Sequence, residues 1–175
     1  MRAGSFAFYH DYTMNTNYIC YTAVMHIYMA ADHNGFKLKN ELKDWLKEQG
    51  HTVSDFGPEV YDKTDDYPDY GIKVARAVAE DPSSRCGIVL CGTGVGMAVV
   101  ADKVKGVRAA LIHDPAIAEA ARRDDNTNVL ALGASFITFG QAKQVVRAWL
   151  ASTFLGAERH QRRIGKIQQY EQEHS

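Results

Sequence analysis

The stretch that decides the fold reads Gly87-Ile88-Val89-Leu90-Cys91-Gly92-Thr93-Gly94-Val95-Gly96-Met97. It opens with a short apolar run, which is typical of a strand that is buried on both faces of a sheet. Alternating glycines follow, and a helical pattern of apolar residues continues from Met97 to Lys103. A buried strand that passes through a tight turn into a helix is the unit from which parallel α/β sheets are built.

The same alternation of strand and helix continues in both directions along the chain. Apolar runs predict strands at 26–31, 51–56, 87–90, 107–112 and 129–132. Helical periodicity follows each of them, at 38–50, 72–78, 97–103, 116–123 and 141–150, and a charged helix begins at Glu158. Strands that are joined by crossover helices run parallel. We therefore predict an α/β fold with a single doubly wound, Rossmann-like domain, a five-stranded parallel sheet and helices on both faces.

Length and composition narrow the class of protein. The chain has 175 residues, enough for one domain with its own core, and its formal net charge is −1. This near-balance argues against a nucleic-acid or membrane partner that is bound over the whole surface. The three cysteines, Cys20, Cys86 and Cys91, lack the spacing of a disulfide framework or a zinc site. A reducing, cytoplasmic compartment fits this pattern best.

The first segment, Met1 to Val24, differs from the rest of the chain. It is rich in Tyr, Asn and Thr, and it lacks the apolar core and the small-residue cleavage site of a signal peptide. We expect it to be an N-terminal extension, with the domain itself at 25–175. A disordered tail, an arm packed on the surface, and upstream sequence translated ahead of a start at Met25 are the alternatives.

In a doubly wound sheet, ligands bind outside the carboxyl ends of the strands, beside the loops that lead into helices. This rule selects candidate residues before any family is considered. They are Asp32, His33, the turn Cys91–Gly96, His113, Asp114 and the loop Asp124–Asn128. We expect all of them to lie at one edge of the sheet.

The glycine-rich turn carries the clearest chemical signal. Its glycines let backbone N–H groups point toward a ligand, and the N-terminus of the following helix adds partial positive charge. The same field favours the thiolate form of Cys91. The turn lacks the lysine of a P-loop and the spacing of G-x-G-x-x-G, so a dinucleotide site is poorly supported. A tight turn with an inert, buried cysteine is the alternative.

Two smaller groups could bind or move charge. Asp32 and His33 end the first predicted strand, where a carboxylate could relay protons and an imidazole could contact an anion. A helix N-cap followed by a surface histidine is the alternative there. Arg159 and Arg163 are spaced i, i+4 on the last predicted helix, so their guanidinium groups share one face and suit a phosphate. A solvated basic face is the alternative for this pair.

Six segments between His26 and the C-terminus are informative as a set, through their order and spacing along the chain. They are Ala31–Phe36, Asp66–Tyr70, Ile88–Met97, Lys103–Ala110, Asn126–Gly133 and Arg159–Arg163. In this order and at these distances they resemble the ribose-5-phosphate isomerase B family, which includes the galactose-6-phosphate isomerase subunits. Several segments in order are far more specific than any single loop.

The resemblance implies an aldose–ketose isomerase of a phosphorylated sugar that uses no metal and no cofactor and works through a cis-enediolate. On this interpretation Cys91 is the base that moves a proton between adjacent carbons. Thr93 would hold the substrate, and Asp32 would move the proton between the two oxygens. Backbone amides of the turn would hold the negative oxygen, and they belong to Gly92, Gly94, Val95 and Gly96.

The resemblance also implies how the phosphate is bound and how subunits assemble. His33, Arg159 and Arg163 would grip the phosphate, and Tyr67 would line the sugar pocket. In the family the active site lies at the interface of a homodimer, and the arginine-bearing tail reaches across it. We expect a homodimer, or a tetramer built from two of them, with a sugar phosphate as substrate and no nucleic-acid or membrane partner.

Two departures from the family pattern concern ring opening and phosphate binding. Asp124 and Asp125 stand where the ribose enzymes have a histidine and an asparagine, and that histidine is thought to open the furanose ring. Asp124 could accept a proton but would donate one poorly unless its pKa were raised. Ser135 stands where a phosphate-binding arginine is usual. His113 could replace the missing histidine, although a plain loop histidine is the alternative.

These departures leave several functions open. The leading hypothesis is conversion of ribose 5-phosphate to ribulose 5-phosphate. A tetrose phosphate such as erythrose 4-phosphate cannot form a furanose ring and would not need the histidine, and a hexose phosphate such as galactose 6-phosphate is a further alternative. Two other classes are a catalytically silent sugar-phosphate binding protein and a nucleotide-binding regulatory domain that uses Asp55.

Overall fold

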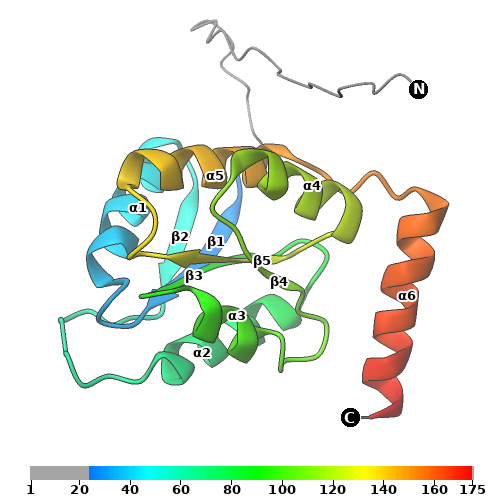
Figure 1. Cartoon of the computed structure of the whole chain (residues 1–175), viewed down its shortest axis with the longest axis horizontal. Helices are drawn as coiled ribbons and strands as arrows, with labels where there is room; N and C mark the ends of the chain where they lie inside the picture. Colours follow the sequence, from blue (N-terminus) through cyan, green and yellow to red (C-terminus); the bar gives the residue numbers. More distant parts are fainter. Residues whose placement is uncertain (1–23, 175) are drawn as a thin grey trace, which may run out of the picture.

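A parallel sheet lies at the centre of this computed structural model, between two layers of helices (Figure 1). The structure describes residues 24–174, and within them the sheet has five strands. The strands are β1 (His26–Ala31), β2 (Thr52–Asp55), β3 (Cys86–Cys91), β4 (Ala109–Leu111) and β5 (Val129–Gly133). The helices are α1 (Phe36–Glu48), α2 (Tyr67–Ala79), α3 (Val95–Ala101), α4 (Pro115–Asp125), α5 (Phe139–Ala151) and α6 (Glu158–Glu173). The prediction of a doubly wound α/β fold is confirmed.

The strand order explains which helices cover which face. The strands lie in the order β2-β1-β3-β5-β4, and all neighbours are parallel. The connections through α1 and α4 move toward one edge of the sheet, whereas those through α2 and α3 move toward the other. Because such crossovers are right-handed, α1 and α4 lie on one face, and α2 and α3 lie on the opposite face. The helix α5 packs beside α4 on the first face (Figure 1).

Alternating side chains of β3 contribute to two cores, one on each face of the sheet. Ile88 and Leu90 belong to the apolar cluster under α1, α4 and α5. Val89 and Cys91 point to the other face and join the cluster under α2 and α3. Cys91 therefore ends the strand on the face where its own turn continues into α3.

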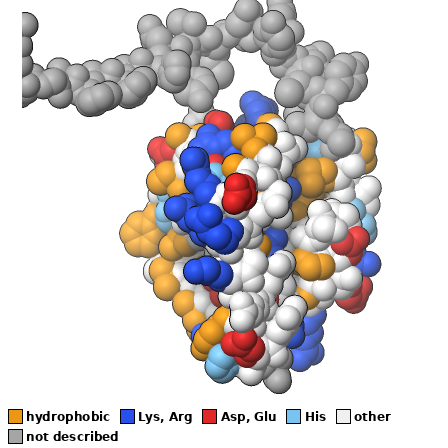
Figure 2. All heavy atoms as spheres, turned by 90° about the vertical axis from the view of Figure 1, so that its right-hand side faces the viewer, with side chains coloured by type: hydrophobic (Ala, Val, Ile, Leu, Met, Phe, Trp, Pro, Cys, Tyr) orange, Lys and Arg blue, Asp and Glu red, His pale blue; other side chains and the backbone are white. Residues whose placement is uncertain are grey.

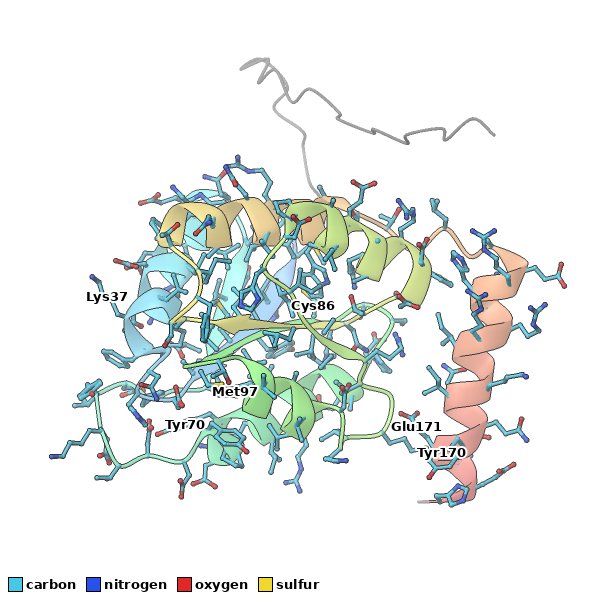
Figure 3. All side chains as sticks on the ribbon, in the orientation of Figure 1. Lys37, Tyr70, Cys86, Met97, Tyr170 and Glu171 are labelled. Carbon is cyan, nitrogen blue, oxygen red and sulfur yellow. The ribbon has the colours of Figure 1, made fainter. Side chains whose placement is uncertain are left out.

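The last helix, α6, stands at the side of the domain and away from the sheet (Figure 1). Its Glu171 accepts a hydrogen bond from Gly106 N–H at 3.2 Å, and Figure 3 shows Glu171 directed toward the domain body. Ile167 and Tyr170 are 49% and 64% exposed. The described part of the subunit thus leaves an apolar portion of α6 open to solvent.

Two further points concern the N-terminal extension and membrane-spanning helices. The expected extension, Met1–Val24, lies outside the described residues apart from Val24. Between residues 24 and 174, no helix combines the length and the apolar composition that would let it cross a bilayer.

Candidate active site

The carboxyl ends of β1 and β3 mark the point where the winding of the sheet reverses. The chain leaves β1 for α1 on one face and leaves β3 for α3 on the other, which is where ligands bind in such sheets. Asp32 N–H donates to the carbonyl oxygen of Leu90 at 3.2 Å. Because Ala31 and Leu90 are paired in the adjacent strands β1 and β3, the next residues, Asp32 and Cys91, lie side by side. A Cβ on Gly35 would lie 2.8 Å from that same carbonyl oxygen. Glycine is therefore required for the two loops to approach this closely.

Cys91 ends β3 with 5% of its surface exposed. Its Sγ accepts a hydrogen bond from Gly94 N–H at 3.1 Å, and such a donor stabilises negative charge on the sulfur. Cys86, at the start of the same strand, is 1% exposed, and burial raises the pKa of its thiol to about 11. Figure 3 shows Cys86 inside the domain, with Met97 and Tyr70 on the α2 and α3 side. The structure thus separates an inert core thiol from a thiol beside a turn rich in donors.

The glycine-rich turn packs directly on the end of β5. Gly94 has a φ of +78°, and a Cβ there would lie 2.5 Å from Leu111 Cδ1 and 2.8 Å from Gly133 N. A Cβ on Gly133 would lie 2.5 Å from the carbonyl oxygen of Thr93. Gly133 N–H donates to His113 Nε2 at 3.2 Å. His113 and Thr93 are therefore brought together at the carboxyl edge, as the sequence predicts.

Tyr67 lies over the start of α3. A Cβ on Gly96 would lie 2.7 Å from the Tyr67 ring, so only glycine leaves room for the ring there. Thr93 is exposed, and its Oγ1 accepts a hydrogen bond from Val95 N–H at 3.3 Å. Gly94 N–H is taken by the cysteine sulfur. Two of the amides that we expect to hold a negative oxygen therefore already have an acceptor inside the turn.

Asp32 and His33 are both held by hydrogen bonds after β1. Asp32 is 5% exposed, and its Oδ1 accepts a hydrogen bond from Gly35 N–H at 3.0 Å within the turn that precedes α1. His33 Nδ1 lies 2.7 Å from Asp65 Oδ1. Sequence reasoning missed Asp65. The acidic run 62–66 signals a charged loop, but nothing in it identifies the histidine as the partner.

The loop Asp124–Asn128 does not lie at the carboxyl edge, so that expectation is wrong. Asp124 and Asp125 end α4 and the remaining residues lead into β5, and residues that precede a parallel strand lie at its amino end. The five residues of β5 separate the loop from the Cys91 edge by about 16 Å. Asp114, in contrast, is at the carboxyl edge, where its Oδ1 caps α4 by accepting from Ala116 N–H at 2.8 Å.

Asp124 forms an ion pair with the side chain of the preceding residue, Arg123. The Arg123 guanidinium donates to both oxygens of Asp124, at 2.9 and 3.0 Å. These hydrogen bonds hold the pKa of Asp124 below its usual range. Asp125, the next residue, is exposed. Within its own subunit, Asp124 is an ionised partner of Arg123 and is too far from Cys91 to act on the same ligand.

The tail arginines lie beside this second group. Arg159 Nε donates to His160 Nε2 at 2.8 Å, and His160 Nδ1 faces Asp124 Oδ1 at 3.5 Å. Arg159 and Arg163 are exposed, and Figure 2 shows Lys and Arg side chains gathered on the side of the molecule that carries α6. The candidate residues therefore fall into two groups, one around Cys91 and one where α4 meets α6.

Two further positions bear on the alternative functions. Ser135 N–H donates to the carbonyl oxygen of Gly92 at 2.9 Å, so this uncharged residue does lie beside the turn. Asp55 ends β2, but Lys39 and Lys43 donate to its two oxygens at 2.6 to 3.0 Å. A carboxylate engaged in this way is poorly placed to hold the ribose of a nucleotide. Among residues 24–174, no cluster of three or more His, Cys, Asp or Glu side chains could hold a metal ion.

Known proteins match this arrangement over most of the chain. The profile of a family described as Ribose/Galactose Isomerase matches residues 27–167. The chain is 44% identical over 147 residues to a probable ribose-5-phosphate isomerase B from Mycoplasma genitalium, covering 84% of this chain and 96% of the relative. It is 42% identical over 136 residues to a D-erythrulose-4-phosphate isomerase from Pectobacterium atrosepticum, covering 76% of this chain and 87% of the relative.

Solved structures agree with the sequence matches. The crystal structure of ribose-5-phosphate isomerase B from Mycoplasma genitalium with bound ribulose-5-phosphate aligns with a TM-score of 0.83 at 44% identity. The alignment covers 85% of this chain and 97% of that one. The resemblance seen in the sequence is confirmed, and the chain belongs to the Ribose/Galactose Isomerase family.

Proposed function

We propose that this protein is an aldose–ketose isomerase that interconverts ribose 5-phosphate and ribulose 5-phosphate through a cis-enediolate. The observation that carries the proposal is the setting of Cys91, whose sulfur accepts a backbone hydrogen bond at the carboxyl edge of β3, one strand away from Asp32. Relatives at 39–44% identity are named ribose-5-phosphate isomerase B, and one of them has been solved with ribulose-5-phosphate bound.

In this reaction Cys91 removes the proton from the carbon beside the carbonyl group and returns it to the neighbouring carbon. Asp32 moves the second proton between the two oxygens. Its burial keeps water away from that transfer, and Gly35 N–H fixes one of its oxygens. The amides of Gly94 and Val95 already have acceptors, so the expected donors to the negative oxygen of the enediolate are Gly92 N–H and Gly96 N–H. The N-terminus of α3 adds partial positive charge.

Binding of the phosphate needs positive charge. His33 supplies it from the group around Cys91, and Arg159 and Arg163 supply it from the group where α4 meets α6. These groups lie apart within one subunit, so we propose that the complete site forms in a homodimer in which α6 of one subunit reaches the Cys91 edge of its partner. The exposed apolar residues of α6 support this arrangement. Because a catalytic thiol must stay reduced, we place the enzyme in the cytoplasm.

A second candidate substrate is a tetrose 4-phosphate. Asp124 stays ionised beside Arg123, so it is a poor proton donor for opening a furanose ring. A tetrose 4-phosphate forms no such ring, and one relative is named D-erythrulose-4-phosphate isomerase. His113 is the alternative ring-opening group, because its ring lies at the carboxyl edge beside Gly133.

Side-by-side assays separate these functions. Purified protein would be tested with ribose 5-phosphate, erythrose 4-phosphate and galactose 6-phosphate in deuterated water, with turnover and deuterium incorporation at the substrate carbon as readouts. We expect the highest kcat/KM with ribose 5-phosphate. A clear preference for erythrose 4-phosphate would favour the second candidate. Thermal stabilisation by sugar phosphates without deuterium incorporation would indicate a silent binding protein.

The role of Cys91 is tested with a matched pair of variants. Cys91→Ala is expected to lower kcat by roughly 10²–10⁴-fold, as removal of a general base does. Cys86→Ala removes the other thiol of β3, which is buried and distant from the turn, and is expected to keep kcat. Full activity in Cys91→Ala would exclude the proposed base for every candidate substrate.

A further inference from the structure

His33 is held in place by a carboxylate from a distant part of the sequence. Asp65 Oδ1 accepts hydrogen bonds from the backbone N–H of His33 at 2.9 Å and from its ring Nδ1 at 2.7 Å. The side chain of Asp65 is 5% exposed, and that of His33 is 25% exposed. One buried oxygen therefore orients both the backbone and the ring of His33, and it keeps a proton on Nδ1.

The opposite ring nitrogen is the one that remains for a ligand. His33 Nε2 lies 2.8 Å from Asn34 Nδ2, at the exposed side of the ring. In this arrangement the amide N–H donates to Nε2, which therefore carries no proton. An anion that displaces the amide would let Nε2 take up a proton and act as a charge-assisted donor. The Asn34 amide nitrogen that contacts Nε2 also lies 3.7 Å from the place of a Cβ on Gly92, so this side of the ring is near the glycine-rich turn of the Cys91 group.

The charges around His33 favour its protonated form. Its pKa is raised, chiefly by the hydrogen bond to Asp65, which together with the charges of Asp32 and Asp65 outweighs partial desolvation. Asp62, in the loop before α2, has a lowered pKa, chiefly through hydrogen bonds from Thr64 and in part through the charge of His33. The charged groups that these interactions identify around the ring, Asp32, Asp62 and Asp65, are acidic.

The loop that supplies Asp65 is anchored at its start. The fully buried Lys39 donates to the carbonyl oxygen of Pro58 at 2.8 Å. Ala31 N–H donates to the carbonyl oxygen of Gly57 at 3.0 Å. Both contacts tie the loop to the elements that flank His33, namely β1 and α1.

We propose that Asp65 is a positioning residue for phosphate binding. It keeps the proton of His33 on Nδ1, directs Nε2 toward the substrate, and maintains the imidazolium at a pH where an ordinary histidine has become neutral. This inference rests on the proposed function, in which His33 contacts the phosphate. Asp65 itself touches no substrate atom and acts only through His33.

The first test measures the titration of His33 directly, without turnover. The ring Cε1–H signal of His33 is followed by NMR from pH 5 to 9 and identified by its loss in His33→Gln. We expect His33 to titrate above the ordinary value of 6.5 in the wild type and close to 6.5 in Asp65→Asn. Asp66→Asn is the matched control, because Asp66 is exposed, adjacent in the same loop and makes no side-chain capping bond.

The second test measures KM against pH in the full-length enzyme. We expect the KM of Asp65→Asn to approach the wild-type value at pH 6 and to rise to about tenfold above it near pH 8, with little change in kcat. The second ionisation of the substrate phosphate, near pH 6, affects both enzymes equally and cancels in the ratio. Asp65→Glu keeps the charge and is expected to restore the wild-type pH profile, even if its KM is higher throughout.

The outcomes separate this inference from the proposed function. An unchanged His33 titration in a folded Asp65→Asn variant, or a KM ratio that does not vary with pH, would overturn the role of Asp65. If the His33 titration shifts as expected but no sugar phosphate is turned over, then the role of Asp65 toward His33 is supported and the isomerase proposal fails. Binding of inorganic phosphate, followed by the same NMR signal, then tests whether His33 Nε2 receives an anion at all.

Discussion

Gly94 and Gly50 adopt the same left-handed backbone, with φ of +78° and +89°, but their surroundings differ. A Cβ on Gly94 would lie 2.5 Å from Leu111 Cδ1 and 2.8 Å from the backbone of β5, whereas nothing lies within 4 Å of a Cβ on Gly50. Left-handed geometry alone costs an L-residue about 1–2 kcal/mol. The comparison of these glycines therefore separates backbone strain from close packing at the active-site turn.

We expect Gly50→Ala to lower the free energy of unfolding by about 1 kcal/mol and to leave activity intact. Gly94→Ala should lower it by roughly 1–3 kcal/mol more, because the turn and β5 must move apart. It should also reduce kcat, since the N–H that donates to Cys91 Sγ would shift. Urea denaturation and steady-state kinetics measure both effects. Equal losses of stability in the two variants would contradict the packing argument.

At the scale of elements, a buried ion cluster joins α1 to β2. Lys39 is fully buried, and its ammonium donates to both oxygens of Asp55 and to Pro58. Burial alone would raise the pKa of Asp55, but hydrogen bonds from Lys39, Lys43 and Gly57 N–H outweigh it and place the pKa below its usual value. This cluster fixes the start of the loop that carries Asp65 to His33.

Asp55→Asn is expected to lower the free energy of unfolding by about 3–5 kcal/mol at pH 7, because it leaves the Lys39 ammonium buried without its carboxylate. Lys39→Met should be milder, since Lys43 still faces Asp55. Adding Lys39→Met to Asp55→Asn should recover part of the loss. Urea midpoints of the three variants test this order, and a more severe Lys39→Met would contradict it.

The same cluster predicts a dependence on pH. A carboxyl group with a lowered pKa in the folded state stabilises the fold fully above its unfolded pKa of about 3.9, and this contribution disappears as the pH falls through the folded value. The stability gap between wild type and Asp55→Asn should therefore be constant from pH 7 to about pH 5 and narrow below pH 4. A gap that persists unchanged at pH 2.5 would indicate that the Asp55 charge is not its cause.

At the scale of the whole molecule, the candidate residues divide between two ends of the sheet. Asp32, His33 and Cys91 lie at the carboxyl edge, whereas Arg159 and Arg163 lie on α6, next to the loop that precedes β5. A helix that stands beside its own domain with Ile167 and Tyr170 exposed gains little stability within one subunit. The sharing of the site between subunits that we propose would account for both features.

Mixed dimers test this sharing. Cys91→Ala and Arg163→Ala subunits, each strongly impaired alone, should together form a mixed dimer with one intact site of two. The isolated mixed dimer should therefore show about half of wild-type activity, and the random mixture about one quarter. Two purification tags on co-expressed subunits isolate the mixed species. Pairing Cys91→Ala with Asp32→Ala is the control, since both defects lie in the same half of the site and no intact site can form. Absence of recovery in the first pair would exclude the shared site.

Much of this protein is determined by the sequence alone. Short continuous apolar runs and helical stretches of period 3.6 are local patterns, so they predict each strand and helix, and right-handed crossovers then dictate the layers. The turn after β3 carries its own signal in its glycines, which identify Cys91. The same reasoning misplaced the loop Asp124–Asn128, because it counted the loop among those that follow strands when this loop precedes one.

Only the tertiary structure decides which side chains meet. The pairing of His33 with Asp65 spans 32 positions, and the contact of Gly133 with His113 spans 20. Neither follows from local periodicity, because each depends on the lengths of crossovers and on glycines that let backbones approach within van der Waals distance. Secondary structure is encoded in neighbouring residues, whereas the charge and orientation of the active-site side chains depend on contacts between segments that are distant in the sequence.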